Sequence, residues 1–243
     1  MSRGYREPIE KPRRFYKSVE VEPQDGAFAV RLDGRPVHTP KGSRLALPTR
    51  ALADLVAEEW AAQGEALEIP LMYATRLANT AIDAVPAARD GTAEVVANYA
   101  ASDLVCYWAE EPQALVERQR LHWGPVLDWV EAEAKLSFIR AAGIVHQAQP
   151  EPTLEQVKAI ALALDDFALA GLAFGASLFG SAILALALQR GWATGEQAFA
   201  LSRLDEAWQE EKWGVDAEAA ERAAAIKAEA LMLERWFRAL DAD

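Results

Sequence analysis

The feature that most constrains the fold is an uncharged run of 22 residues, 167–188. Such a run is long enough to cross a bilayer, and Gly171 and Gly175 within it form a GxxxG pattern. Its composition favours a different interpretation, because it is rich in Ala, Gly and Ser, Asp165 and Asp166 directly precede it, and no basic cluster marks a cytoplasmic side. We therefore predict a soluble protein in which this run is a buried helical hairpin with a break near the two glycines.

The first fifth of the chain shows the alternation of apolar and polar residues that is typical of strands. Asp33-Gly34 lies between two such runs, and this dipeptide is a strong hairpin signal because both turn residues need positive φ. A second turn is expected at 24–26 and a third at 40–42. We expect an antiparallel meander with strands at 15–21, 28–32, 35–39 and 45–47.

Helical spacing follows the strands. The apolar residues of 52–60 and of 77–85 recur every three or four positions, which predicts two helices packed on the sheet. Asp90-Gly91-Thr92 is a candidate start for another helix, and residues 104–108 are predicted to form one more strand. This part of the chain is therefore expected to have an α+β fold.

Beyond residue 111 every signal is helical. Pro125 suits the first position of a helix, and Thr153 and Thr194 each begin a capping-box sequence with Gln three residues later. Asp216 can cap a last helix whose apolar stripe ends at Leu240. We predict an N-terminal antiparallel sheet with packed helices, followed by an all-α domain. The expected ranges are a loose tail at 1–12, an α+β domain at 13–111 and a helical domain at 112–243.

Charge excludes several classes of function. The net charge is −12, and it is unevenly placed: residues 1–50 carry +5, whereas residues 51–243 carry −17. An acidic chain lacks the basic footprint that nucleic-acid binding needs. The single cysteine, Cys106, excludes an intramolecular disulfide framework and fits a reducing compartment.

Signatures of catalysis and of metal binding are missing. The sequence has no GxGxxG, P-loop, HExxH or GxSxG motif. His38, His122 and His146 are far apart in the sequence, and ligand sets usually show close spacing. We expect no catalytic residue, no metal site and no cofactor.

The most unusual segment is 203–214, RLDEAWQEEKWG. On a helix, Glu206, Glu210 and Trp213 lie on the side opposite Leu204 and Trp208, so a tryptophan is expected to be exposed among carboxylates. A solvated acidic face is one interpretation. A general acid or base at Glu206 or Glu210 is another, and it requires a pocket and a shifted pKa. A binding surface fits the composition better, since an exposed tryptophan is a good anchor and carboxylates select a basic partner.

Six stretches of the chain together carry a family resemblance. They are RRFYKSVEV (13–21), LDGRPVHTPKG (32–42), LPTRALADLVAEEWAAQGE (47–65), RLANTAID (76–83), SDLVCYW (102–108) and RLDEAWQEEKWG (203–214). In this order they resemble the Atp-twelve family of assembly chaperones for the α subunit of F-type ATP synthase, and the similarity runs from about residue 13 to residue 240. Trp108 departs from the pattern, because a basic residue is expected there.

The resemblance implies a chaperone without catalytic activity that holds the unassembled α subunit until the β subunit replaces it. It also implies that an acid of the Asp205–Glu206 pair is functionally important. We expect Glu206, with Asp205, Trp213 and Glu210, to bind the partner. A monomer is expected, in the bacterial cytoplasm or, in a eukaryote, in the mitochondrial matrix. The alternatives are an acid–base enzyme that uses Glu206 and Glu210, and a membrane-associated scaffold that uses 167–188.

Overall fold

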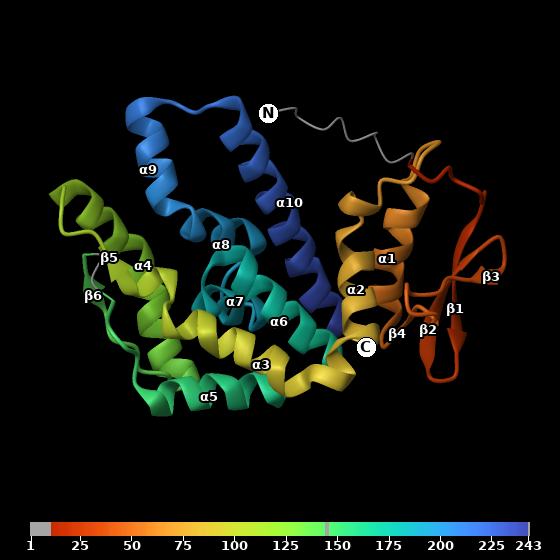
Figure 1. Cartoon of the computed structure of the whole chain (residues 1–243), viewed down its shortest axis with the longest axis horizontal. Coiled ribbons are helices and arrows are strands. Elements are labelled where there is room, and N and C mark those ends of the chain that lie inside the picture. The colour runs from red at the N-terminus through yellow and green to blue at the C-terminus, as the bar shows by residue number, and fades with distance from the viewer. Residues whose placement is uncertain (1–10, 144–145, 243) are drawn as a thin grey trace, which may run out of the picture.

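The computed structural model describes residues 11–143 and 146–242, and it shows a small sheet followed by a large assembly of helices (Figure 1). This confirms the predicted α+β class. The strands are β1 (Val19–Gln24), β2 (Ala27–Leu32), β3 (Arg35–Pro36), β4 (Ala46–Leu47), β5 (Tyr107–Trp108) and β6 (Ala141–Ala142). The α-helices are α1 (Arg50–Ala61), α2 (Tyr73–Asp83), α3 (Val85–Ala101), α4 (Gln113–Ala134), α5 (Glu151–Leu162), α6 (Asp166–Phe179), α7 (Ala182–Gln189), α8 (Gly195–Ser202), α9 (Leu204–Trp213) and α10 (Ala217–Leu240), with 3₁₀ turns η1 (Ile69–Leu71) and η2 (Leu104–Cys106).

Two Asp-Gly turns shape the N-terminal sheet. Asp25, Gly26, Asp33 and Gly34 all have positive φ, as the two-residue hairpin turns require, and both turns are confirmed. The predicted simple meander is wrong in its last step. The third strand shortens to two residues, and β3 and β4 pair with the two ends of β2 rather than with each other along their length.

Helix α1 joins the sheet to the far end of the chain. Thr49 caps α1 by accepting a hydrogen bond from the Leu52 amide, and the Thr49 hydroxyl donates to the Ala239 carbonyl at 2.6 Å. The helix packs against β1 and β2 on one side and against α10 on the other. The C-terminal helix therefore stabilises the position of the sheet.

The uncharged run forms two packed helices, α6 and α7, as predicted. The break was predicted at the wrong place: it lies at Gly180, which has φ +63°, and at Ser181, whose hydroxyl caps α7. Every residue from Ala182 to Leu188 is buried. Within the described ranges, every helix is either too short or too polar to cross a membrane.

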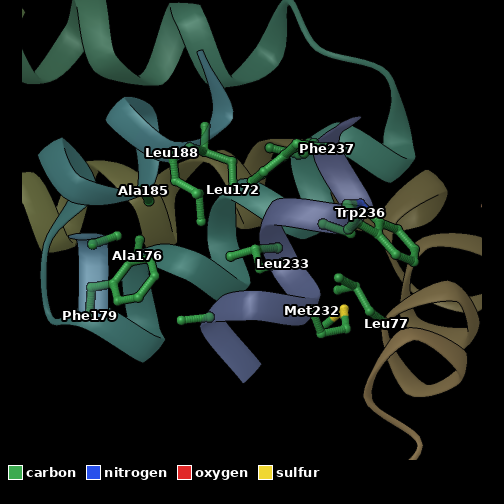
Figure 2. Close-up of a cluster of buried hydrophobic side chains, with 14 of the residues drawn as sticks. Leu77, Leu172, Ala176, Phe179, Ala185, Leu188, Met232, Leu233, Trp236 and Phe237 are labelled. Carbon is green, nitrogen blue, oxygen red and sulfur yellow. The ribbon is translucent and has the colours of Figure 1, made fainter. Parts of the chain in front are cut away.

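Gly171 and Gly175 serve close packing rather than a turn. A Cβ built on Gly175 would lie 2.9 Å from Leu233 Cδ2, and one on Gly171 would lie 3.0 Å from the Phe237 ring. The absence of side chains at these two positions thus lets α10 approach α6. Figure 2 shows Leu233 and Phe237 of α10 within the same apolar cluster as Leu172 of α6.

Three local predictions were wrong because tertiary contacts compete with sequence signals. Residues 104–108 form a 3₁₀ turn and only two strand residues. The helix start expected at Asp90-Gly91-Thr92 has a counterpart inside α3, where Ala88 leaves helical geometry, with φ −136° and ψ 26°, and a second helical stretch follows the kink. Pro125 lies inside the continuous α4. Thr153 caps nothing, since α5 already begins at Glu151 and the Thr153 hydroxyl donates to the Ser137 carbonyl at 2.8 Å. By contrast, the capping box at Thr194 and the cap at Asp216 are confirmed.

Helix packing crosses the predicted boundary at residue 111. Helices α2 and α3 pack against α6, and α3 also packs against α5. One hydrophobic core runs from Tyr16 in the N-terminal segment to Ala239 near the end of α10. The described residues thus share a single core, which connects the helices after residue 111 to the sheet.

Candidate functional site

The segment 203–214 forms α9, a separate helix at the far end of the molecule from the sheet (Figure 1). Arg203 leaves helical geometry, with φ −116° and ψ 21°, and so separates α9 from α8. Gly214, with φ +86°, ends the helix and leads into α10. Leu204 is the one buried residue of α9, so most of this helix is available at the surface.

The inner side of α9 is attached to α4 by polar contacts. The Gln119 side chain donates to Asp205 Oδ1 at 2.8 Å, and Arg118 forms an ion pair with Glu211 at 2.7 Å. The Arg118 guanidinium also lies 5.8 Å from the centre of the Trp208 ring, within cation–π range. These contacts fix which side of α9 faces outward.

Three of the four expected site residues gather on the outer side of α9. Arg203 pairs with Glu210 at 2.9 Å and lies 4.0 Å from Glu206. Trp213 is 79% exposed at the end of the helix. Glu206, Glu210 and Trp213 line one shallow groove with the start of α10. We name this set, with Arg203, the α9 outer face. It presents an aromatic side chain beside two carboxylates and one guanidinium.

Asp205 lies on the other side of the helix. Its carboxylate is half-buried, and burial raises its pKa, although the hydrogen bond from Gln119 lowers it. Gln119 is completely buried and also accepts a hydrogen bond from the Ala109 amide at 2.7 Å. The structure therefore separates the adjacent acids Asp205 and Glu206 into two environments.

A second groove surrounds Asp205, and sequence reasoning did not find it. Its lining includes Tyr107 and Trp108 of β5 and two further carboxylates, Glu110 and Glu111. The Arg140 guanidinium lies 5.8 Å from the centre of the Trp108 ring. A cation is thus present at the position where the family pattern led us to expect a basic residue, but it comes from a different segment. No spacing in the sequence links residue 140 with residue 108.

The carboxylates of the α9 outer face do not resemble a separated acid–base pair. Glu206 and Glu210 face the same guanidinium in an open groove, whereas acid–base catalysis depends on environments that move two pKa values apart. Within 11–143 and 146–242, no three His, Cys, Asp or Glu side chains are grouped as a metal ion would require. Cys106 is buried, and burial raises the pKa of its thiol, which disfavours the thiolate nucleophile.

Comparison with known proteins decides the family. A family model described as ATP12 chaperone protein matches residues 13–131. The crystal structure of Atp12 from Paracoccus denitrificans is 39% identical, covers 93% of this chain and 97% of its own, and superposes with a TM-score of 0.86. The chain belongs to the ATP12 chaperone family. That membership supports an assembly-chaperone role for ATP synthase.

Two further relatives agree with this assignment. A crystal structure of an Agrobacterium tumefaciens protein is 41% identical, covers 94% of this chain and 86% of its own, and has a TM-score of 0.89. A mitochondrial atp12 protein of Schizosaccharomyces pombe is 26% identical over an alignment of 225 residues, and the match covers 85% of this chain and 76% of the relative. Similarity therefore extends from the sheet into the helical part, beyond the range matched by the family model.

Proposed function

We propose that this chain holds the unassembled α subunit of F-type ATP synthase and prevents its aggregation until the β subunit replaces it. The observation that supports this most directly is the α9 outer face, in which Trp213 is 79% exposed beside Glu206 and Glu210. An exposed tryptophan can enter an apolar pocket of a partner, and carboxylates at the rim favour a basic surface around it.

The proposed role needs a rigid surface and no reactive centre. Subunits of a ring expose large apolar interfaces before assembly, and such patches aggregate. A holder must cover them reversibly, and an aromatic anchor with a charged rim has the anatomy of a protein interface. We further propose that the chain acts as a monomer and works in the bacterial cytoplasm or, in a eukaryote, in the mitochondrial matrix.

Charge reversal at Glu206 tests the proposal. Glu206→Lys should change the free energy of unfolding by only about ±0.5 kcal/mol, because the side chain is 52% exposed. It should weaken α-subunit binding by roughly 2–5 kcal/mol, because a lysine would then face a basic partner. The measurement is light scattering of unassembled α subunit with each chaperone variant, alongside thermal melts.

Glu155→Lys is the matched control, since Glu155 is an exposed acid on α5, away from α9. It should protect the α subunit as well as the wild type does. Equal protection by a folded Glu206→Lys variant would remove Glu206 from the interface. No protection by the wild type would overturn the proposed function.

A second pair of variants separates the two adjacent acids. Asp205→Asn keeps an oxygen that can accept the Gln119 hydrogen bond and removes only the charge, and Glu206→Gln removes only the charge on the outer face. If the partner contacts the outer face alone, Glu206→Gln should reduce protection and Asp205→Asn should not. The reverse result would move the contact to the groove around Asp205.

A further inference from the structure

The N-terminal segment contains an aromatic row that runs from the surface into the core. Phe15 is 74% exposed and contacts the edge of Tyr16, with ring centres 5.3 Å apart. Tyr16 in turn lies 5.8 Å from the Trp60 ring, and its hydroxyl donates to the Trp60 carbonyl at 2.7 Å. Tyr16 and Trp60 are buried and build the core, whereas Phe15 leaves most of its apolar ring in solvent.

A groove lies beside this row. Its walls are formed by Phe15, Tyr16 and Trp60 together with apolar residues of the sheet, Leu32, Pro36 and Val37. Its volume is about 560 Å³. Trp60 is buried, and among the described residues its indole N–H has no acceptor. The groove is large enough for one or two side chains of another protein.

The lining of the groove contains one carboxylate, Asp33, beside Arg35 and His38, but the segment that forms most of its walls is basic. Residues 11–50 contain nine Lys and Arg and four Asp and Glu. Glu22 and Asp25 are paired with arginines of the sheet, and Asp33 accepts hydrogen bonds from the Lys17 and Ser18 amides. No carboxylate of the described residues forms an ion pair with the cations nearest the aromatic row in sequence or in the groove lining, which are Arg13, Arg14, Lys17 and Arg35. Of these, Arg14 is held by the fold: its guanidinium donates to the Ala61 and Gln63 carbonyls and lies 4.7 Å from the centre of the Tyr16 ring.

We propose that this groove is a second docking site for the client subunit, and that its occupant is an acidic segment carrying an aromatic or aliphatic side chain. The proposal rests on the proposed holding function. The apolar side chain would enter between Phe15 and Val37, and the neighbouring carboxylate would pair with Arg35. Charge complementarity selects this occupant, since the free cations repel the basic surface that the α9 outer face would bind.

The two sites lie toward opposite ends of the long axis of the molecule (Figure 1). Two contacts on one rigid body make the second binding event intramolecular, so the overall affinity exceeds that of either site. A client bound at both sites contacts the acidic α9 outer face and the basic surface around the groove at the same time. These two contacts of opposite charge fix the orientation of the client on the chaperone.

The test uses the full chain and unassembled α subunit. Arg35→Glu should weaken binding about tenfold, which corresponds to about 1.4 kcal/mol, and Arg35→Lys should not. Arg190→Glu is the control, because Arg190 is likewise an exposed arginine without an ion pair among the described residues. At about 1 M salt the difference between Arg35→Glu and the wild type should shrink, since the Debye length falls to about 3 Å.

Photocrosslinking identifies the occupant. A benzophenone amino acid in place of Phe15 should crosslink to a peptide of the α subunit rich in Asp and Glu, whereas the same probe at Val95, an exposed position of α3, should not crosslink to that peptide. A basic peptide, a second copy of this chain, or no product at Phe15 would overturn the proposal.

The outcomes separate this proposal from the proposed function. If the wild type protects the α subunit and Arg35→Glu protects it equally, only the second docking site fails. If the wild type does not protect the α subunit, the proposed function fails. A synthetic peptide with Phe between glutamates then tests the groove alone by fluorescence anisotropy. It should bind more tightly than its lysine counterpart, and equal binding would overturn the site.

Discussion

The helices α7 and α9 lie in the same half of the chain and have similar lengths, but their surroundings are opposite. Seven of the eight residues of α7 are buried, and the helix has no charged side chain. In α9 only Leu204 is buried, and five of its ten residues are charged. The difference separates a helix that builds the core from a helix for which we propose a role in binding. We expect changes in α7 to destabilise the fold, and changes on the α9 outer face to alter chiefly what the protein binds.

The ends of the two helices differ in the same way. The start of α7 is capped twice, by the Ser181 hydroxyl and by Asp103, whose carboxylate accepts from the Ile183 amide at 3.0 Å. Asp103 is completely buried. By contrast, no side chain caps the start of α9. Buried amides without partners are costly, whereas exposed amides can bond to water, so only α7 needs this support.

The largest effect is expected in α7. Leu184→Ala should lower the free energy of unfolding by about 2–5 kcal/mol, because the side chain is completely buried and the surroundings cannot fill the cavity. Urea unfolding measures this. The matched change Leu231→Ala on α10, where the side chain is 40% exposed, should cost at most about 1 kcal/mol. Equal losses at the two positions would mean that α7 is not a core helix.

The next effect is a pH dependence at the start of α7. Burial raises the pKa of Asp103 from 3.8 to about 7, against the hydrogen bonds from Ser181 and nearby amides, which lower it. The folded protein therefore binds this proton more tightly than the unfolded chain does. The contribution of Asp103 to stability is full below about pH 4 and is lost as the pH rises toward 7, by up to about 1.4 kcal/mol per pH unit.

Asp103→Asn should remove this slope, because the amide does not titrate. The measurement is the free energy of unfolding of both proteins between pH 4 and pH 8. The variant should also lose a constant amount, since an amide offers one acceptor oxygen where the carboxylate offers two. Parallel curves for the two proteins would contradict a raised pKa at this position.

The smallest effect on folding, and a large one on binding, is expected in α9. Trp213→Ala should change the free energy of unfolding by no more than about 0.5 kcal/mol, because the ring is 79% exposed. It should weaken α-subunit binding by about 2 kcal/mol or more if the ring is an anchor. Trp192→Ala is the control, since Trp192 stacks on Trp129 and lies outside the α9 outer face. Unchanged α-subunit binding by Trp213→Ala would show that Trp213 is not an anchor and that the α9 outer face is only a solvated acidic surface.

Much of the fold could be predicted from the sequence where the signal is local. The Asp-Gly turns, the Thr194 capping box and the Asp216 cap each depend on a few neighbouring residues, and all are confirmed. The burial of most of 167–188 followed from composition. Predictions failed where distant residues compete. The glycines of α6 pack against α10 instead of breaking the helix, and Thr153 bonds to Ser137 instead of capping α5.

The sequence by itself determined which side chains of α9 face outward, because helical periodicity separates Glu206, Glu210 and Trp213 from Leu204 without reference to any other segment. Only the tertiary structure decided what the inner side meets. Asp205 bonds to Gln119, 86 positions earlier in the chain, and Arg140 lies over Trp108. Such contacts depend on how helices pack on a common core. Periodicity within one helix carries no information about which segment of the chain will lie beside it.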